Sequence, residues 1–237
     1  FGVAGKSVNL MSKSSAIEGL GVYNSVVSEE NFYQMLRELI NARDSLNTKS
    51  IPLIVTKELS NKCKMFYDGF NNPNKRLLTN DDKWSSNEAL AELDSALHYE
   101  LIIYDNDPAF MLDVLRNLRS GSASYSLFAT EYQLFNSGIT NDNFTREAEV
   151  ICAMSSYLSY QDPNTLSFVE AFRAHFGIEP NQYAIRGYDI ADYHIQRLLY
   201  GCGPMRGILV GFDFTQDQQN RWVELRRFEN FEWKLLR

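Results

Sequence analysis

Several polar and aromatic residues stand at the ends of short apolar runs, where side chains can bind a small molecule. They are Asn24 and Ser25, Thr56 and Lys57, the stretch 104–107 with Tyr104 and Asn106, the stretch 130–132 with Glu131 and Tyr132, and the stretch 159–161 with Tyr160. Tyrosine can stack on a ligand, while amides, hydroxyls and carboxylates hydrogen-bond it. These residue types predict binding of a small polar solute.

Catalytic and metal-binding patterns are absent from the sequence. Asp105 and Asp107 could act as paired carboxylates, but Asp107 before Pro108 is explained by a helix cap. The histidines are far apart, and none follows an expected strand: His98, His175 and His194. The sequence shows no Rossmann glycine pattern, nucleophile elbow or metal-type cysteine spacing. We therefore predict a protein that is not an enzyme and uses no cofactor or metal.

Composition excludes further classes of partner. The net charge of -7 provides no basic surplus to neutralise phosphates, which argues against nucleic acid and anionic membranes. No apolar run reaches the roughly 20 residues needed to span a bilayer. Cys152 lies in an apolar run and is expected to be buried. The three cysteines, Cys63, Cys152 and Cys202, cannot all pair within the chain, and the sequence leaves one disulfide open. The start at Phe1, without Met or a signal peptide, is typical of a processed product or a fragment.

Apolar runs alternate with amphipathic stretches along most of the chain. Expected strands cover 20–25, 51–56, the run ending at Tyr104, the run ending at Glu131, and 150–158; expected helices cover 28–42, 88–97, 107–120 and the two stretches after 165. Strands separated by helices predict an α/β fold with a mostly parallel sheet and helices on both faces. The segment 71–86 is expected to be a surface loop.

Three regions follow from this pattern. Residues 1–19 form an irregular leader, 20–203 an α/β lobe, and 204–237 a C-terminal β-hairpin extension packed on that lobe. The hairpin is expected to turn at 217–220, with Val223, Leu225 and Phe228 on its returning arm.

Two expected helices around the corner FGIEPN carry a family signature. Gly177 ends the first helix, Pro180 suits the start of the second, and Gly187 predicts close approach of another backbone. The sequence here resembles the last helices of type 1 periplasmic binding proteins, the amino-acid and branched-chain amino-acid receptors. The residues that carry the resemblance are Phe172, Phe176, Gly177, Pro180, Tyr183, Gly187, Tyr188, Asp189 and Ile190. The match is densest between 165 and 203 and corresponds mainly to the family's second lobe.

The resemblance implies roles for individual residues. Glu131 matches the place of an acid that holds a ligand's ammonium group. Tyr104 and Tyr160 match the closing wall of the site, while Asp189 matches a structural aspartate. The family's first lobe, which grips the ligand's carboxylate, is not recognisable here.

The resulting hypothesis is non-enzymatic recognition of an amino-acid-like solute by a domain of an exported bacterial protein, in the periplasm or at the cell surface. Expected partners are an amino acid or peptide, a transporter or other cell-envelope protein, and a second copy of the chain. The alternative is a cell-surface structural or interaction module that keeps the fold but lacks a small-molecule cleft. A flavodoxin-like enzyme is a third reading, without support from an acid/base pair at the strand ends.

Overall fold

The computed structural model describes residues 8–9, 23–44, 50–79, 90, 93–137, 148–201, 203–216 and 218–236. The chain divides into two compact units. The helical unit comprises Phe1–Asn31 and Ser155–Val223, and the sheet unit comprises Phe32–Met154 and Glu224–Arg237. This division differs from the single lobe expected over 20–203, because the chain leaves the sheet unit after Met154 and returns to it at Glu224.

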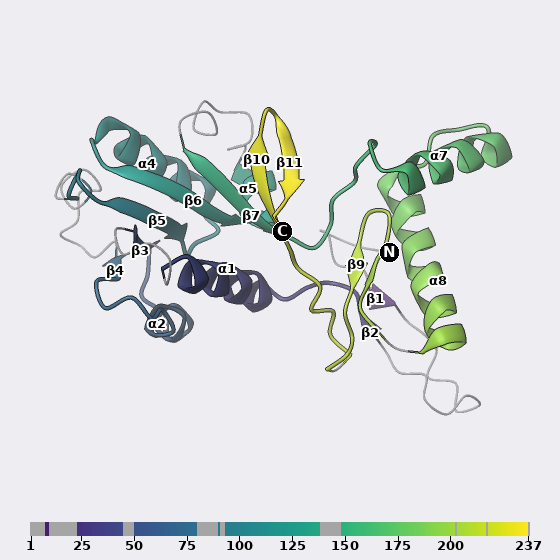
Figure 1. The fold of residues 1–237 in the computed structure, drawn as a ribbon, viewed down its shortest axis with the longest axis horizontal. Helices are drawn as coiled ribbons and strands as arrows, with labels where there is room; N and C mark the ends of the chain where they lie inside the picture. Colours follow the sequence, from purple (N-terminus) through teal and green to yellow (C-terminus); the bar gives the residue numbers. More distant parts are fainter. Residues whose placement is uncertain are drawn as a thin grey trace. The chain divides into compact units, whose positions relative to one another are not determined.

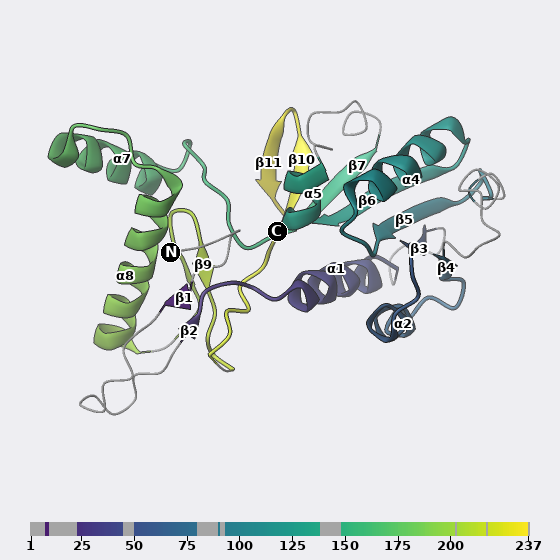
Figure 2. The same cartoon turned by 180° about the vertical axis from the view of Figure 1, so that it is seen from behind.

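A seven-stranded sheet in the order β11-β10-β7-β6-β5-β3-β4 forms the sheet unit. Its parallel part contains β3 (Ser50–Thr56), β4 (Arg76–Thr79), β5 (His98–Ile103), β6 (Ser124–Thr130) and β7 (Glu149–Met154). Figures 1 and 2 show α1 (Glu29–Asp44) and α2 (Asn61–Asp68) on one face and α4 (Pro108–Ser120) on the other, where α4 contacts α5 (Glu131–Ser137). The predicted α/β class is confirmed.

Local sequence explains the central elements of this unit. Every residue of β3 is buried, as expected for a parallel strand covered on both faces. Asp107 caps α4 by accepting a hydrogen bond from the Ala109 N–H at 3.0 Å, and Pro108 occupies the first turn. The helix then buries its apolar face: Phe110, Met111, Val114, Leu115 and Leu118.

The terminal hairpin was predicted with the wrong turn. Its arms are β10 (Glu224–Glu229) and β11 (Glu232–Leu235), joined through Asn230 and Phe231, which both have positive φ. Leu225 and Phe228 therefore lie on the first arm, not the returning one. The polar run near 217–220 suggested a turn, but Asn220 instead bonds the backbone of Ser25 and Gly211 inside the helical unit.

Other boundaries also differ from expectation. The predicted loop 71–86 contains β4 at the sheet edge, and residues 80–89, with Trp84, lie outside the described residues. In the expected helix 88–97, residues 93–97 form turns. The expected strand at 20–25 is reduced to β2 (Tyr23–Asn24), paired with β1 (Val8–Asn9) in the helical unit. The sequence reasoning also missed α2 and α5.

The helical unit contains the predicted helix pair as α7 (Pro163–Phe176) and α8 (Gln182–Tyr200). Tyr193 of α8 packs with Val210, Phe212 and Phe214 beside the short strands β8 (Met205–Arg206) and β9 (Gly211–Phe212). The buried Asp189 carboxylate accepts hydrogen bonds from three backbone N–H groups, those of Ile208, Leu209 and Val210, at 2.7, 2.8 and 2.9 Å. Asp189 thus ties α8 to the β8–β9 connection.

The face of α8 away from this core is apolar and exposed. A stripe at helical spacing contains Tyr188, Ile195, Leu198 and Leu199. Phe176 on α7 is exposed as well. The prediction for Gly187 was wrong, because a Cβ there would meet nothing within 4 Å.

A polar network occupies the amino end of the sheet on the α1 face. Arg43 of α1 donates to Glu149 of β7 at 2.9 Å, and Ser126 of β6 donates to the same carboxylate at 3.0 Å. Glu100 of β5 is 2% exposed, and one of its carboxylate oxygens has no hydrogen-bond partner among the described residues. Burial raises the pKa of Glu100 to about 7, although the charge of Arg43 opposes this shift.

We predict that Glu100→Gln makes folding less sensitive to pH. Because the pKa of Glu100 is higher in the folded protein than its ordinary value of 4.5, wild-type stability falls as pH rises from about 4.5 to 7. The penalty above pH 7 is on the order of 3 kcal/mol. Urea unfolding from pH 5 to 8 should show the free energy of unfolding of the variant rising relative to that of the wild type. If the free energies of unfolding of the two proteins depend on pH in the same way, the prediction is wrong. Glu38→Gln, at an exposed position of α1, is the control.

Candidate functional site

The carboxyl ends of the parallel strands meet at one edge of the sheet unit, where open α/β folds bind ligands. Four of the five predicted binding residues belong to this unit: Tyr104, Asn106, Glu131 and Tyr132. Tyr160 belongs to the helical unit, in the turn before α7, and is exposed. The sheet topology therefore brings the loops after β5 and β6 to one edge. Tyr160 is part of the other unit and not of this edge.

Gln133 holds this edge together. Its Nε2 donates to the carbonyl oxygens of Ile103 and Asp105 at 2.6 and 2.7 Å, and to the Tyr33 hydroxyl at 2.9 Å. Its Oε1 accepts the Thr130 N–H at 3.0 Å, while Thr130 Oγ1 accepts the Gln133 N–H at 3.3 Å. One buried amide thus joins the ends of β5 and β6 to α1.

Sequence reasoning missed Gln133, although its signal was present. Thr130 and Gln133 form the T-x-x-Q capping box, in which the cap side chain and the third helical side chain bond each other's backbone N–H. This motif also corrects the setting of Glu131, which was expected at the end of the preceding strand. Glu131 is the first residue of α5 and half-buried, while Tyr132 after it is exposed.

Tyr104 lies within an aromatic cluster at the end of β5. Its ring stacks on Tyr33 with centroids 4.3 Å apart and lies 5.2 Å from Phe66. Its backbone N–H donates to Val55 at 2.7 Å, and its carbonyl accepts from the Thr56 hydroxyl at 3.0 Å. These contacts make Tyr104 a half-buried, rigidly placed wall of the edge.

The loop after Tyr104 is ordered by local polar bonds. Asp105 accepts the Asp107 N–H at 2.8 Å, and Asp107 pairs with Lys57 at 2.9 Å. The hydrogen bond from Lys57 lowers the pKa of Asp107, and the same bond raises the pKa of Lys57. Because Asp107 both caps α4 and pairs with Lys57, the two aspartates do not form a catalytic carboxylate pair. Asn106 between them is exposed.

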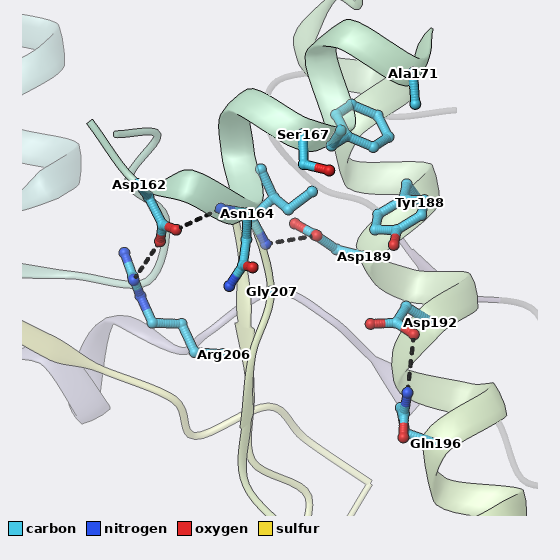
Figure 3. Close-up of a pocket in the computed structure, with 12 residues that line it drawn as sticks. Asp162, Asn164, Ser167, Ala171, Tyr188, Asp189, Asp192, Gln196, Arg206 and Gly207 are labelled. Atoms are coloured by element: carbon cyan, nitrogen blue, oxygen red, sulfur yellow. Dashed lines mark hydrogen bonds and ion pairs between the residues drawn. The ribbon is translucent and has the colours of Figure 1, made fainter. Parts of the chain in front are cut away.

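A concave site lies wholly in the helical unit. This α7–α8 pocket has a volume of about 620 Å³ and is bounded by α7, α8 and the segment 206–208. Figure 3 shows Asp162 and Arg206 opposite Tyr188 and Asp192, with Gly207 between them. Asp162 pairs with Arg206 at 3.6 Å and caps α7 through the Asn164 N–H at 2.9 Å. The sequence reasoning did not select this pocket.

Solved structures share this fold. Two structures of an ABC transporter substrate-binding protein from Desulfitobacterium hafniense match 86% of the chain at 16% identity, one in complex with Leu (TM-score 0.53) and one described without a ligand (TM-score 0.55). The chain has the fold of these binding proteins. An extracellular ligand-binding receptor from Desulfohalobium retbaense DSM5692 also matches, at 15% identity over 86% of this chain and 39% of its own, with a TM-score of 0.49. The structural resemblance predicted from the helix pair is confirmed at the level of the fold.

The chain spans 65% of the length of the Desulfitobacterium protein. Comparison with protein-family models and with curated proteins gives no match. Within the described residues, no helix is both long and apolar enough to cross a membrane. The same part of the chain contains no cluster of side chains suited to a metal ion.

We predict that Gln133→Leu destabilises the sheet unit by about 2–4 kcal/mol, because it leaves buried backbone groups of Thr130, Ile103 and Asp105 without their partner. Urea unfolding monitored by circular dichroism provides the measurement. Gln34→Leu removes an exposed amide from α1 and should change stability by less than about 0.5 kcal/mol. Equal stability of the two variants would show that the Gln133 contacts do not support the edge.

Proposed function

We propose that the chain recognises a small polar solute without acting on it, as part of an exported bacterial protein. The observation that carries the proposal is the convergence of ordered polar loops at the carboxyl edge of the parallel sheet. The shared fold with substrate-binding proteins supports it. The solute is amino-acid-like, because a carboxylate at Glu131 can accept a charge-assisted bond from an ammonium group.

The binding residues proposed at this edge are Tyr104, Asn106, Glu131 and Tyr132. Tyr160, which the sequence resemblance also implies, belongs to the helical unit and remains a separate proposal. Tyr104 is held by stacking and backbone bonds, and Glu131 is positioned by the capping box of α5. Tyr132 and Asn106 are exposed. A transporter or another protein of the cell envelope is the proposed partner, and the periplasm or cell surface the proposed location. Weak affinity is expected of a single wall, because a ligand buries little surface there.

We predict that an amino acid or short peptide raises the melting temperature, and that Glu131→Ala removes this shift. A ligand at about 100 times its Kd adds about 2.7 kcal/mol, which corresponds to a shift of several degrees. A thermal-shift screen of amino acids, peptides and sugars makes the measurement, with Glu38→Ala on the exposed face of α1 as the matched control. A screen without any shift, or an undiminished shift in Glu131→Ala, would refute the proposed site.

A second candidate function is an interaction module that pairs with another copy of itself. The exposed stripe on α8 favours it, because Ile195, Leu198 and Leu199 are 53%, 76% and 66% exposed. A helix that is apolar on two sides is usually covered on both. Ile195, Leu198 and Leu199 are themselves uncharged, and Asp192 lies one turn before Ile195 on the same face. A second copy that covers only these three side chains therefore strands no ion.

If this second function holds, the chain forms a concentration-dependent dimer that Leu198→Glu with Leu199→Glu abolishes. Two buried carboxylates in an apolar interface cost several kcal/mol, which lowers affinity by more than about a hundredfold. Light scattering coupled to size-exclusion chromatography gives the mass. Leu59→Glu, another exposed leucine but in the sheet unit, should leave it unchanged. A wild-type monomer at every concentration would exclude the module.

A further inference from the structure

The α7–α8 pocket has the size of a small-molecule site. Its volume of about 620 Å³ lies within the range of roughly 300–1,000 Å³ typical of ligand pockets. Its walls come from elements that Asp189 fastens together, since Asp189 on α8 bonds the backbone at Ile208 and Leu209. The pocket is therefore part of the packed helical unit.

The lining has more negative than positive charge. Three aspartates and one arginine contribute to it: Asp162, Asp189, Asp192 and Arg206. Arg206 is paired with Asp162, and the Asp189 oxygens are occupied by backbone N–H groups. Asp192 accepts a longer bond of 3.3 Å from the Gln196 amide. The Asp192 carboxylate is thus the lining charge least committed to the fold.

An aromatic pair lies beside this carboxylate. Phe168 of α7 and Tyr188 of α8 have ring centroids 4.7 Å apart, and both line the pocket. Tyr188 and Asp192 are four residues apart, so they share one face of α8, and Figure 3 shows both pointing toward the Gly207 segment. Aromatic faces and a carboxylate together attract an ammonium group more strongly than either alone.

We infer that the α7–α8 pocket binds a small organic cation, with its ammonium group between Asp192 and the Phe168–Tyr188 pair. An anion is disfavoured by the surplus of aspartates, and a purely apolar ligand would strand the Asp192 charge. The net charge of -7 on the chain also favours the approach of cations. The inference does not depend on the solute site at the sheet edge, which uses other residues.

The test is an NMR titration of the full chain with choline, following the backbone amides of α8. The neutral isostere 3,3-dimethyl-1-butanol has the same shape without the charge, and sodium chloride controls for ionic strength. Choline is expected to shift these amides with a Kd on the order of millimolar, while the alcohol and the salt leave them unchanged. Equal binding of the alcohol, or no choline-dependent shift at all, overturns the inference.

Variants locate the cation. Asp192→Asn should weaken choline binding about tenfold, and Tyr188→Leu about fivefold, whereas Tyr188→Phe retains binding because it keeps an aromatic face. Asp192 is half-buried and Tyr188 is exposed, so these changes leave the core of α8 intact. Asp68→Asn, at an exposed position of α2, is the matched control and should leave choline binding unchanged. Undiminished binding in Asp192→Asn, or loss of binding in Glu131→Ala, overturns the inference because it places the cation elsewhere.

Discussion

The side chain of Gln133 is the interaction on which the functional edge depends. Parallel strands leave their last carbonyl groups at one edge, and these groups need donors once they are buried. Gln133 donates to the carbonyl groups of Ile103 and Asp105 after β5 and accepts the N–H of Thr130 at the end of β6, while its own backbone N–H completes the start of α5. A neutral amide suits this position because it both donates and accepts. The polar loops around it are therefore held by a neutral side chain.

The parts of the fold that sequence reasoning predicted are those with a local cause. The apolar run of β3, the Asp107–Pro108 start of α4 and the left-handed Gly177 after α7 each depend on neighbouring residues. The parts that it missed depend on distant ones. Asn220, for example, has the composition of a turn residue, but its amide bonds the backbone of Ser25 from far along the chain. No local pattern identifies such a partner.

The same contrast holds for the candidate sites. The edge of the parallel sheet could be located from strand order alone, and the residues after β5 and β6 follow directly. The α7–α8 pocket could not, because it is formed where Asp189 draws the backbone at Ile208 and Leu209 onto α8. The sequence resemblance implied only a structural role for Asp189. Its structural contact shapes the concave surface beside it.

The pairing of β10 with β7 has a consequence for the order in which the protein can fold. Met154 pairs with Glu224, so all of residues 155–223 must leave the ribosome before this ladder can close. Until then β7 has an open edge with unpaired N–H and C=O groups, flanked by buried, apolar residues. During synthesis this edge is a template for pairing with other chains. The larger part of the helical unit, Ser155–Val223, is thus made during the interval in which the nascent sheet is most prone to aggregate.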